Sequence, residues 1–352
     1  MSRYSPSSLL AFASALLTRA GLPADRARIV SEVLLDADLL GHTTHGLDML
    51  PRYLQELQDG RMARDGEPAV LQDRGCAVTW DGRRLPGPWL ITSAIAVARE
   101  RAAAHGTGIV VIRRSHHIGC LQAYLEPVAR DGLVILLTCS DPSGAGVAPH
   151  GGTSSTLTPN PLAVGFPTSG DPVLIDVSMS TTTNAMIGRV REEGRELPGR
   201  WLIDADGRPT SDPAVLQGER AGAMLPLGGL DLGHKGFALA LMVEALTSAL
   251  GGFGRADAPG EWGASVFLQV IDPAAFGGGE AFLRETTALA ARCRSSAVPP
   301  GSPPVRLPGE RALALRRRQL REGVALHPTI VPALAAWAAR LDVPLPAGAA
   351  SP

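Results

Sequence analysis

Lysine and aromatic residues are scarce in this chain. Of the 33 basic side chains among its 352 residues, only Lys235 is a lysine, and aromatic residues make up 4% of the total. The net charge is -1, and the chain has no basic block of the kind that a nucleic-acid backbone requires. The arginine cluster Arg316–Arg318 is interpreted as a solvated helix face, with a place near a cofactor phosphate as the less favoured alternative. A hydrophobic content of 45% is typical of a globular protein, so we expect one that does not bind nucleic acid.

Cysteine motifs and long apolar segments are also missing. The four cysteines show no CxxC pair, no metal-ligand spacing and no clustering with histidines, so we expect no metal site. The apolar stretch after Lys235 is interrupted by Glu244 and is too short to span a bilayer. The apolar run 9–17 lacks a basic flank beyond Arg3 and continues with helical spacing, which favours a helix over a signal peptide. We therefore expect a cytoplasmic protein without a membrane segment.

The order of apolar patterns indicates an α/β protein. In chain order, the spacing predicts helices over 6–20, 23–40 and 47–59, a strand at 77–80, a helix over 91–105, a strand at 108–113, a helix over 120–131, strands at 133–138 and 172–176, a helix that begins at Lys235, a strand at 265–272, and helices over 310–323 and 328–340. The run from 108 to 138 reads strand, helix, strand, which predicts a βαβ unit. A chain of this length exceeds the size of one hydrophobic core, so more than one lobe is expected.

Histidines lie in three loop motifs, which hold His42 and His45, His116 and His117, and His234. Histidine is the natural general acid and base near neutral pH, and loop positions at the ends of elements favour a functional role. A metal hydrolase that uses these loops is an alternative, although no HExxH motif is present. The residues alone therefore indicate an enzyme with histidine acid–base chemistry.

Lys235 follows a glycine-rich run and is expected at the start of a helix. A cation there opposes the helix dipole, so it is best tolerated beside an anion or a strong acceptor. Chance survival of one lysine in an arginine-biased chain is the alternative. The hydroxyl-rich segment that follows Asp176 is suited to hydrogen-bond a ribose or phosphate. No G-x-G-x-x-G fingerprint is present, so a dinucleotide is not the first hypothesis from motifs alone.

The chain resembles the malate/L-lactate dehydrogenase family of NAD(P)-dependent oxidoreductases, whose members include ureidoglycolate dehydrogenase, sulfolactate dehydrogenase and Δ1-piperideine-2-carboxylate reductase. The resemblance covers about residues 6–340 and rests on these segments in family order: Thr44-His45-Gly46 with Arg52-Tyr53, Ser115-His116-His117-Ile118-Gly119, Pro149-His150-Gly151-Gly152, Asn160-Pro161-Leu162-Ala163, Asp176-Val177-Ser178, Trp201 with Asp206-Gly207-Arg208-Pro209-Thr210, Leu225-Pro226-Leu227-Gly228-Gly229, Gly233-His234-Lys235-Gly236, Ile271-Asp272-Pro273 and Leu307-Pro308-Gly309-Glu310.

The resemblance implies a fold and a reaction. The fold is α/β and specific to the family, without a Rossmann domain, with large mixed or antiparallel sheets and packed N- and C-terminal helices. The reaction is hydride transfer between nicotinamide C4 and the C2 carbon of a small 2-oxo or 2-hydroxy acid, in a protein that is usually a homodimer. The expected domains are a helical segment with the substrate loop (1–60), a first α/β lobe (61–139 with 296–352) and a cofactor-binding lobe (140–295).

The resemblance also implies roles for individual residues. His117 is the expected acid/base and His45 a second catalytic residue that binds or polarises substrate. Thr44, Arg52 and His116 are expected to bind substrate. The expected cofactor contacts are Ser140, Asp176, Val177, Ser178, Lys235, Gly309, Glu310 and Arg311. NAD and NADP both stay open, because no ribose-reading acidic residue can be identified, and Arg311 could serve a 2′-phosphate.

Two departures from the family pattern bear on the substrate. Thr43 and Thr44 stand where many members have Asp-Ser, and Met49 stands where the family commonly has an arginine. Arg52, three residues further on nearly the same helical face, could substitute as the carboxylate ligand. The His-His pair and Gly-His-Lys-Gly also occur in the imine reductase branch, so a cyclic imino acid is the rival substrate. A nucleotide-binding protein without activity is the remaining alternative.

Overall fold

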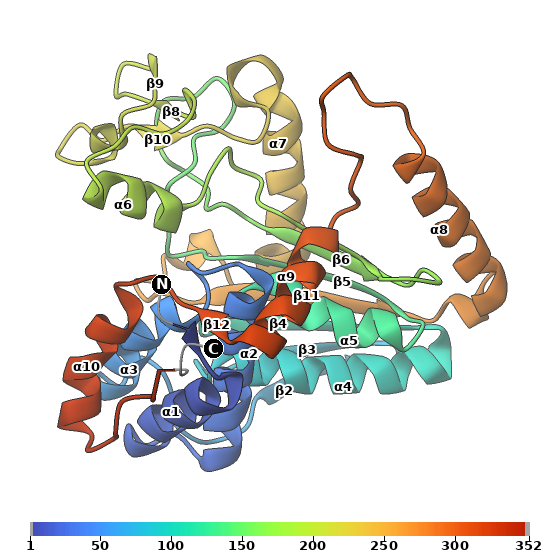
Figure 1. The fold of residues 1–352 in the computed structure, drawn as a ribbon, viewed down its shortest axis with the longest axis horizontal. Coiled ribbons are helices and arrows are strands. Elements are labelled where there is room, and N and C mark those ends of the chain that lie inside the picture. The colour runs from blue at the N-terminus through green and yellow to red at the C-terminus, as the bar shows by residue number, and fades with distance from the viewer. Residues whose placement is uncertain (1–2, 349–352) are drawn as a thin grey trace.

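The helices near the two ends of the chain pack together, as expected. The computed structural model describes residues 3–348 (Figure 1). The predicted terminal helices are confirmed: α1 (Pro6–Arg19), α2 (Ala24–Leu40), α3 (Leu50–Gln58) after a 3-10 turn (Leu47–Met49), α9 (Glu310–Glu322) and α10 (Ile330–Arg340). The apolar faces of α1, α2, α3 and α10 share one core that includes Leu16, Leu34, Tyr53 and Leu334, whereas Leu313 of α9 joins the core of the sheet. The short strands β1 (Arg3–Tyr4) and β12 (Val324–Ala325) pair antiparallel, which joins the two ends.

A seven-stranded mixed sheet forms the body of the protein, in the order β2-β3-β4-β11-β5-β6-β7. Its strands are β2 (Ala69–Arg74), β3 (Ala77–Asp81), β4 (Thr107–Ser115), β5 (Val134–Ser140), β6 (Leu162–Phe166), β7 (Val173–Val177) and β11 (Ala264–Ile271). The pair β3–β4 is parallel and the other neighbouring pairs are antiparallel. The helices α4 (Gly87–His105) and α5 (Leu125–Arg130), the latter after a 3-10 turn (Leu121–Tyr124), pack on the sheet. The predicted α/β class is therefore confirmed.

The strand β11 changes the expected local topology. The βαβ unit predicted from residues 108 to 138 would make β4 and β5 neighbours, but β11 lies between them and pairs antiparallel with both. The adjacent parallel pair is instead β3–β4, connected by α4. Alternate side chains of β11, namely Val266, Leu268 and Val270, are fully buried in the sheet core, which explains why this apolar strand takes a central position.

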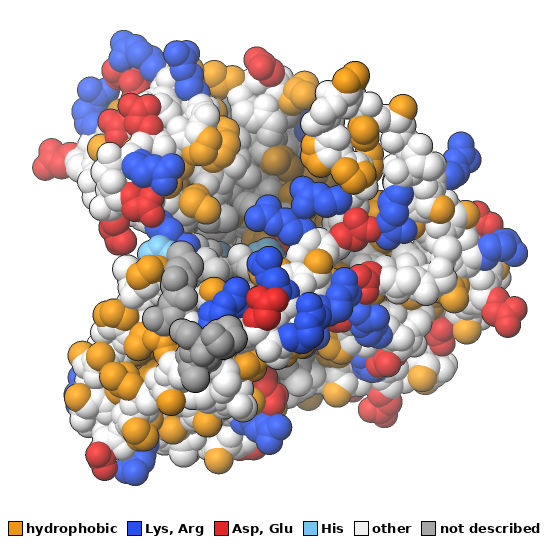
Figure 2. All heavy atoms as spheres, viewed as in Figure 1, with side chains coloured by type: hydrophobic (Ala, Val, Ile, Leu, Met, Phe, Trp, Pro, Cys, Tyr) orange, Lys and Arg blue, Asp and Glu red, His pale blue; other side chains and the backbone are white. Residues whose placement is uncertain are grey.

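A third part of the chain has its own apolar core. It contains the short sheet of β8 (Leu202–Ile203), β9 (Pro209–Thr210) and β10 (Ala223–Met224), with α6 (Asn184–Glu192) and α7 (Gly229–Glu244). Buried residues there include Val147, Ile187 and Met224. Figure 1 shows this part above the sheet, and Figure 2 shows the surface hollowed between it and the rest of the molecule, with histidine side chains visible at the edge. We refer to this depression as the hollow.

Several elements differ from the sequence prediction. The helix expected to begin at Lys235 begins at Gly229, because Gly228 takes the left-handed backbone (φ +97°) that starts α7 six residues earlier. The expectation that Lys235 lies at a helix start is therefore wrong. Two helices were not predicted, α6 and α8 (Gly279–Arg294); in α8 the buried position is Ala290, so its apolar pattern is weak. The strands β2 and β6 of the large sheet and the short strands β1, β8, β9, β10 and β12 were not predicted either.

The remaining helical turns are short. A π-helical turn (Ala245–Ala249) extends α7, and 3-10 turns cover Pro213–Leu216, Arg255–Asp257 and Pro273–Ala275. Among residues 3–348, no helix combines the length and apolar character needed to cross a membrane.

Candidate functional site

Three segments that are distant in sequence bring His45, His117 and Trp262 together. His45 lies in the loop after α2, His117 follows β4, and Trp262 precedes β11. The rings of His45 and His117 are stacked with centroids 6.0 Å apart, and His117 stacks on Trp262 at 4.7 Å. The structure therefore brings together the two histidines that were expected to be catalytic. Trp262 was not predicted from the sequence.

Tyr53 on α3 holds His117 in place. Its hydroxyl lies 2.8 Å from His117 Nδ1 and donates to the His117 carbonyl at 2.9 Å. Gly87, at the start of α4, allows the backbone of α4 to lie against the His117 carbonyl, because a Cβ at this position would lie 2.3 Å from the carbonyl oxygen. Tyr53 belongs to the Arg52-Tyr53 segment of the family resemblance, but it was not expected at the site. Its rarity is a signal that could have found it, since the chain has three tyrosines.

The Tyr53 hydroxyl has one proton and two partners, which determines what His117 can do. Nδ1 also accepts from the Gly119 amide at 3.3 Å, which favours the tautomer with its proton on Nε2; in the other tautomer the phenol oxygen accepts from Nδ1–H, and Nε2 presents a lone pair. When Nε2 gains a proton, the same acceptor stabilises the Nδ1–H of the imidazolium. Burial raises the pKa of Tyr53, so the phenol stays neutral. Burial, then His45 and His116, lower the pKa of His117 well below its ordinary value, so the free ring is neutral at pH 7.

His45 is held by its own loop. Thr44 Oγ1 lies 3.0 Å from His45 Nδ1, so Thr44 orients the ring. Burial, followed by the neighbouring His42, lowers the pKa of His45 to about 4. Beneath the loop, the carboxyl group of Asp38 accepts from the Leu47 amide at 2.8 Å. A Cβ at Gly46 would lie 2.4 Å from this carboxyl group, so glycine is required for the close approach.

The structure does not place His116 where a substrate could touch it. Its side chain is fully buried, and Nε2 lies 3.3 Å from Glu56 Oε2. Its ring also packs edge-on against Trp262 and Tyr53. The expectation that His116 binds substrate is therefore not supported, because its ring is enclosed by Glu56, Tyr53 and Trp262. The His116 ring instead packs edge-on against the Trp262 indole and helps to hold it in place.

Arg52 lies on Trp262. Its guanidinium carbon is 3.4 Å from the indole centroid, while the His117 ring is 4.7 Å from it. Two groups at these distances do not fit on one face of the indole, so Trp262 separates Arg52 from His117. This arrangement does not support Arg52 as the carboxylate ligand of a substrate bound at His117. Met49 packs against the core of the terminal helices and offers no charge.

A second arginine reaches the His45 loop from the other side of the hollow. Arg189 on α6 donates to Thr43 Oγ1 at 3.0 Å and lies 3.4 Å from Asp48 Oδ2. Its side chain is 20% exposed, so this cation is partly desolvated beside the loop. Sequence reasoning missed Arg189, because no local pattern relates α6 to a loop about 145 residues earlier.

The residues expected to contact a cofactor are divided between exposed and buried positions. Val177 and Ser178 lie at the end of β7, where Val177 is exposed and the Ser178 hydroxyl lies 2.6 Å from Ser180 Oγ. The Ser140 hydroxyl is buried, with Thr247 Oγ1 at 2.8 Å and Ser248 Oγ at 3.0 Å. A cofactor contact through the Ser140 hydroxyl is therefore not supported.

The start of α9 lies beside β7. Gly309 has left-handed backbone (φ +92°), and a Cβ there would lie 2.8 Å from the Leu174 side chain. Glu310 accepts from the Leu307 amide at 3.0 Å and pairs with Arg294, so its carboxylate is engaged within the fold. Arg311 is exposed. Lys235 is also exposed, and within residues 3–348 its ammonium makes no hydrogen bond or ion pair.

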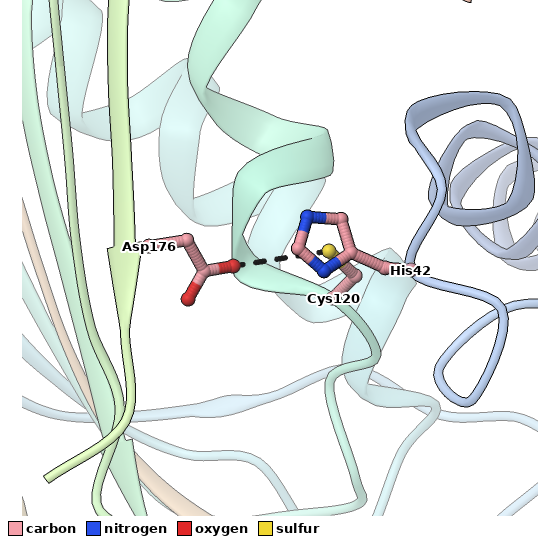
Figure 3. Close-up of side chains that lie close together, drawn as sticks. All are labelled: His42, Cys120 and Asp176. Atoms are coloured by element: carbon pink, nitrogen blue, oxygen red, sulfur yellow. Dashed lines mark hydrogen bonds between the residues drawn. The ribbon is translucent and has the colours of Figure 1, made fainter. Parts of the chain in front are cut away.

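Asp176 lies beside a histidine and a cysteine. Figure 3 shows the side chains of His42, Cys120 and Asp176 pointing toward one another, and one ligand atom from each lies within 4.8 Å of the others. The expectation that no cysteine clusters with the histidine loops is therefore wrong. The three residues come from three separated segments, so no spacing motif could reveal them.

Comparison with known proteins identifies the family of the chain. The family model described as malate/L-lactate dehydrogenase matches residues 4–335. The chain is 34% identical to (2R)-3-sulfolactate dehydrogenase (NADP(+)) of Chromohalobacter salexigens over 93% of this chain and 95% of the relative, and 32% identical to L-lactate dehydrogenase of Cupriavidus necator over 94% and 95%. Its structure resembles that of Δ1-piperideine-2-carboxylate reductase from Pseudomonas syringae, with a TM-score of 0.82, 28% identity, and coverage of 96% and 100%. The chain therefore belongs to the malate/L-lactate dehydrogenase family.

Proposed function

We propose that the protein is an NAD(P)-dependent oxidoreductase that interconverts a small 2-hydroxy acid and its 2-oxo acid, with His117 as the acid/base. The observation that carries this assignment is the hydrogen bond between Tyr53 and His117 Nδ1, because it fixes the ring while Nε2 has no hydrogen-bond partner among residues 3–348. Named relatives act on lactate and sulfolactate, which are both 2-hydroxy acids.

The chain has the groups that a nicotinamide cofactor needs. The bound cofactor would supply or accept the hydride at nicotinamide C4. Exposed Lys235 and Arg311 offer cations for phosphate oxygens, and Val177 and Ser178 offer an apolar surface and a hydroxyl at the end of β7. The close approach of Gly309 to Leu174 brings the start of α9 alongside β7.

In the oxidation direction, neutral His117, in the tautomer whose Nε2 presents a lone pair, takes the hydroxyl proton at Nε2 while C2 loses its hydride. Tyr53 accepts from Nδ1–H throughout, so the ring keeps its orientation as its charge changes. In the reduction direction the imidazolium returns the proton to the carbonyl oxygen. The low pKa of His117 makes its protonated form a strong acid, which favours rapid proton return.

We propose that His45, oriented by Thr44, hydrogen-bonds the substrate. For the substrate carboxylate, Arg189 is the better placed arginine, because it contacts the His45 loop directly while Arg52 lies beyond Trp262. An arginine fork matches a carboxylate in a way that Met49 cannot.

A cyclic imine is the second candidate substrate. The resemblance to Δ1-piperideine-2-carboxylate reductase favours it, together with the His116-His117 pair. The chemistry at His117 would be the same, with the imine nitrogen in place of the ketone oxygen.

The finer assignments are further parts of the proposal. We propose that Arg311 decides the cofactor: NADP is used if Arg311 binds the 2′-phosphate, and NAD is used if it does not. We propose a homodimer in the cytoplasm, supported by exposed apolar side chains on α7 and near α8, such as Leu230, Leu232 and Phe276. The three expected domains stay a proposal, although the third part of the chain has its own core.

The test is oxidation of NADH and NADPH, followed by absorbance, with 2-oxo acids (pyruvate, oxaloacetate, 2-oxoglutarate, sulfopyruvate) and with cyclic imines of piperideine- and pyrroline-2-carboxylate. We expect turnover with at least one 2-oxo acid. The variant His117→Ala should bind cofactor but lose turnover by about 100-fold or more. Turnover only with a cyclic imine would select the second candidate, and unchanged activity of His117→Ala would refute the acid/base assignment.

A further inference from the structure

We propose that His42, Cys120 and Asp176 form a binding site for a thiophilic divalent cation such as Zn²⁺. The ligands would be one imidazole nitrogen, one thiolate and one carboxylate oxygen. This nitrogen, sulfur and oxygen set is typical of zinc, and three protein ligands leave a fourth position for water or another ligand. The ligand atoms lie within 4.8 Å of one another.

The spacing of the ligand atoms is close to what a tetrahedral ion requires. Zinc–ligand bonds of about 2.0–2.3 Å place neighbouring ligand atoms about 3.5 Å apart. The thiol sulfur of Cys120 lies 3.8 Å from Asp176 Oδ2. Small rotations of the His42 and Asp176 side chains would therefore close the site around an ion without movement of the backbone.

Gln122 determines which nitrogen His42 presents. The Gln122 amide nitrogen donates to the Leu174 carbonyl at 3.1 Å, and this fixes its amide oxygen toward His42 Nε2 at 2.7 Å. Because an amide oxygen only accepts, His42 must carry its proton on Nε2. In the neutral ring Nδ1 then has a free lone pair, on the side of Cys120 and Asp176. Histidines that bind metals almost always donate their second ring N–H in this way.

Asp176 is positioned as well. The backbone amide of Gln122 donates to Asp176 Oδ2 at 2.9 Å, so one residue orients both the imidazole and the carboxylate. Burial, then the Asp176 carboxylate, raises the pKa of the Cys120 thiol well above its usual range. The thiol is therefore protonated without a metal, and binding of the cation must release this proton.

Occupation of this site would exclude the nicotinamide cofactor. This consequence rests on the proposed function, in which Val177 and Ser178, the two residues after Asp176, contact the cofactor. A cation that holds the Asp176 carboxylate and fills the space beside it would compete with the cofactor for the end of β7. The site is therefore expected to make the enzyme sensitive to zinc.

Titration of the metal-free protein with Co²⁺, without cofactor, tests the site directly. We expect one equivalent of Co²⁺ per chain, a thiolate-to-cobalt charge-transfer band, release of a proton, and displacement of the band by Zn²⁺. Cys120→Ser should abolish the band, and Cys293→Ser, a control on α8, should keep it. Gln122→Met should weaken affinity by about tenfold or more, because His42 loses its orienting acceptor.

Thermal unfolding of each variant verifies that it is folded, and His42→Gln is a second ligand variant with an expected loss of more than about tenfold in affinity. Persistence of the band in Cys120→Ser, or no band in the wild-type protein, would overturn the site. Binding of NADH or NADPH is then measured by fluorescence with and without Zn²⁺. We expect the apparent Kd of the cofactor to rise with Zn²⁺ in the wild type and not in Cys120→Ser. Equal cofactor affinity with bound Zn²⁺ would refute the exclusion, whereas absence of any cofactor binding would refute the proposed function and leave the cobalt result unaffected.

Discussion

Replacement of Asp38 by asparagine should change how stability depends on pH. Asp38 is buried beneath the His45 loop; one oxygen accepts from the Leu47 amide, and the other has no hydrogen-bond partner in the described part of the chain. Burial raises the pKa of Asp38 from 3.8 to about 8. The folded protein therefore keeps this proton to about pH 8, while the unfolded chain loses it near pH 4. The stability that this proton contributes is complete below pH 3.8 and is lost as pH rises through about 8.

The expected magnitude follows from linkage. At about 1.36 kcal/mol per pH unit, the wild type should lose roughly 4 kcal/mol relative to Asp38→Asn between pH 5 and pH 8. An unfolding entropy of about 2.1 cal/mol/K per residue converts this to about 5 °C in Tm for a chain of this length. The asparagine side chain has the same shape and is neutral at every pH, so its advantage over the wild type should grow by that amount.

The assay is thermal unfolding by circular dichroism of both proteins from pH 5 to pH 8. The difference between the two proteins removes the contributions of the other titrating groups, including His45 and His116. Asp25→Asn, at an exposed position on the same helix, is the control and should differ from the wild type by a constant amount. A constant difference for Asp38→Asn, or one that shrinks as pH rises, would refute a protonated carboxyl at this position.

Three further predictions concern the site. Tyr53→Phe should lower kcat by about 100-fold with little change in KM, because His117 Nδ1 loses its partner; Tyr124→Phe, which removes another buried hydroxyl, should keep kcat, and equal losses would indicate a purely structural role. Arg189→Met should raise KM for the acid by about tenfold or more, and Arg52→Met should raise it less; the reverse order in steady-state kinetics would show that Arg52 binds the carboxylate. Lys235→Met should weaken cofactor binding by about tenfold in a fluorescence titration, with Lys235→Arg close to wild type, and unchanged affinity in the methionine variant would exclude a role for the ammonium.

The sequence predicted the terminal helices and five of the seven strands of the large sheet, because their apolar periodicity is local. It failed where the fold depends on distant pairing. Nothing between 108 and 138 indicates that β11 would separate β4 from β5. The predicted start of α7 was six residues too late, because the glycine-rich segment after Gly228 forms the first turns of the helix although glycine does not favour a helix.

The same distinction applies to the site. His45 and His117 were predicted from loop motifs, and the structure brings them together. Trp262 and Arg189 could not be predicted, since each reaches the site from a segment with no motif of its own. The sequence also could not show that His116 is buried while His117 is half-buried. Two adjacent histidines are equivalent in sequence, and only the fold determines which one is enclosed.

The central position of β11 has a consequence for how the chain is made. During synthesis β4 and β5 emerge more than 120 residues before the strand that joins them, as the pairing of Leu268 with Val110 and Leu137 shows. Until then both strands expose unpaired edges, which are prone to pair with other chains. Folding of the sheet therefore waits for residue 271, the last residue of β11. A ribosome-bound fragment that ends before β11 should remain sensitive to protease, and extension past β11 should convert the whole sheet to a resistant form in one step.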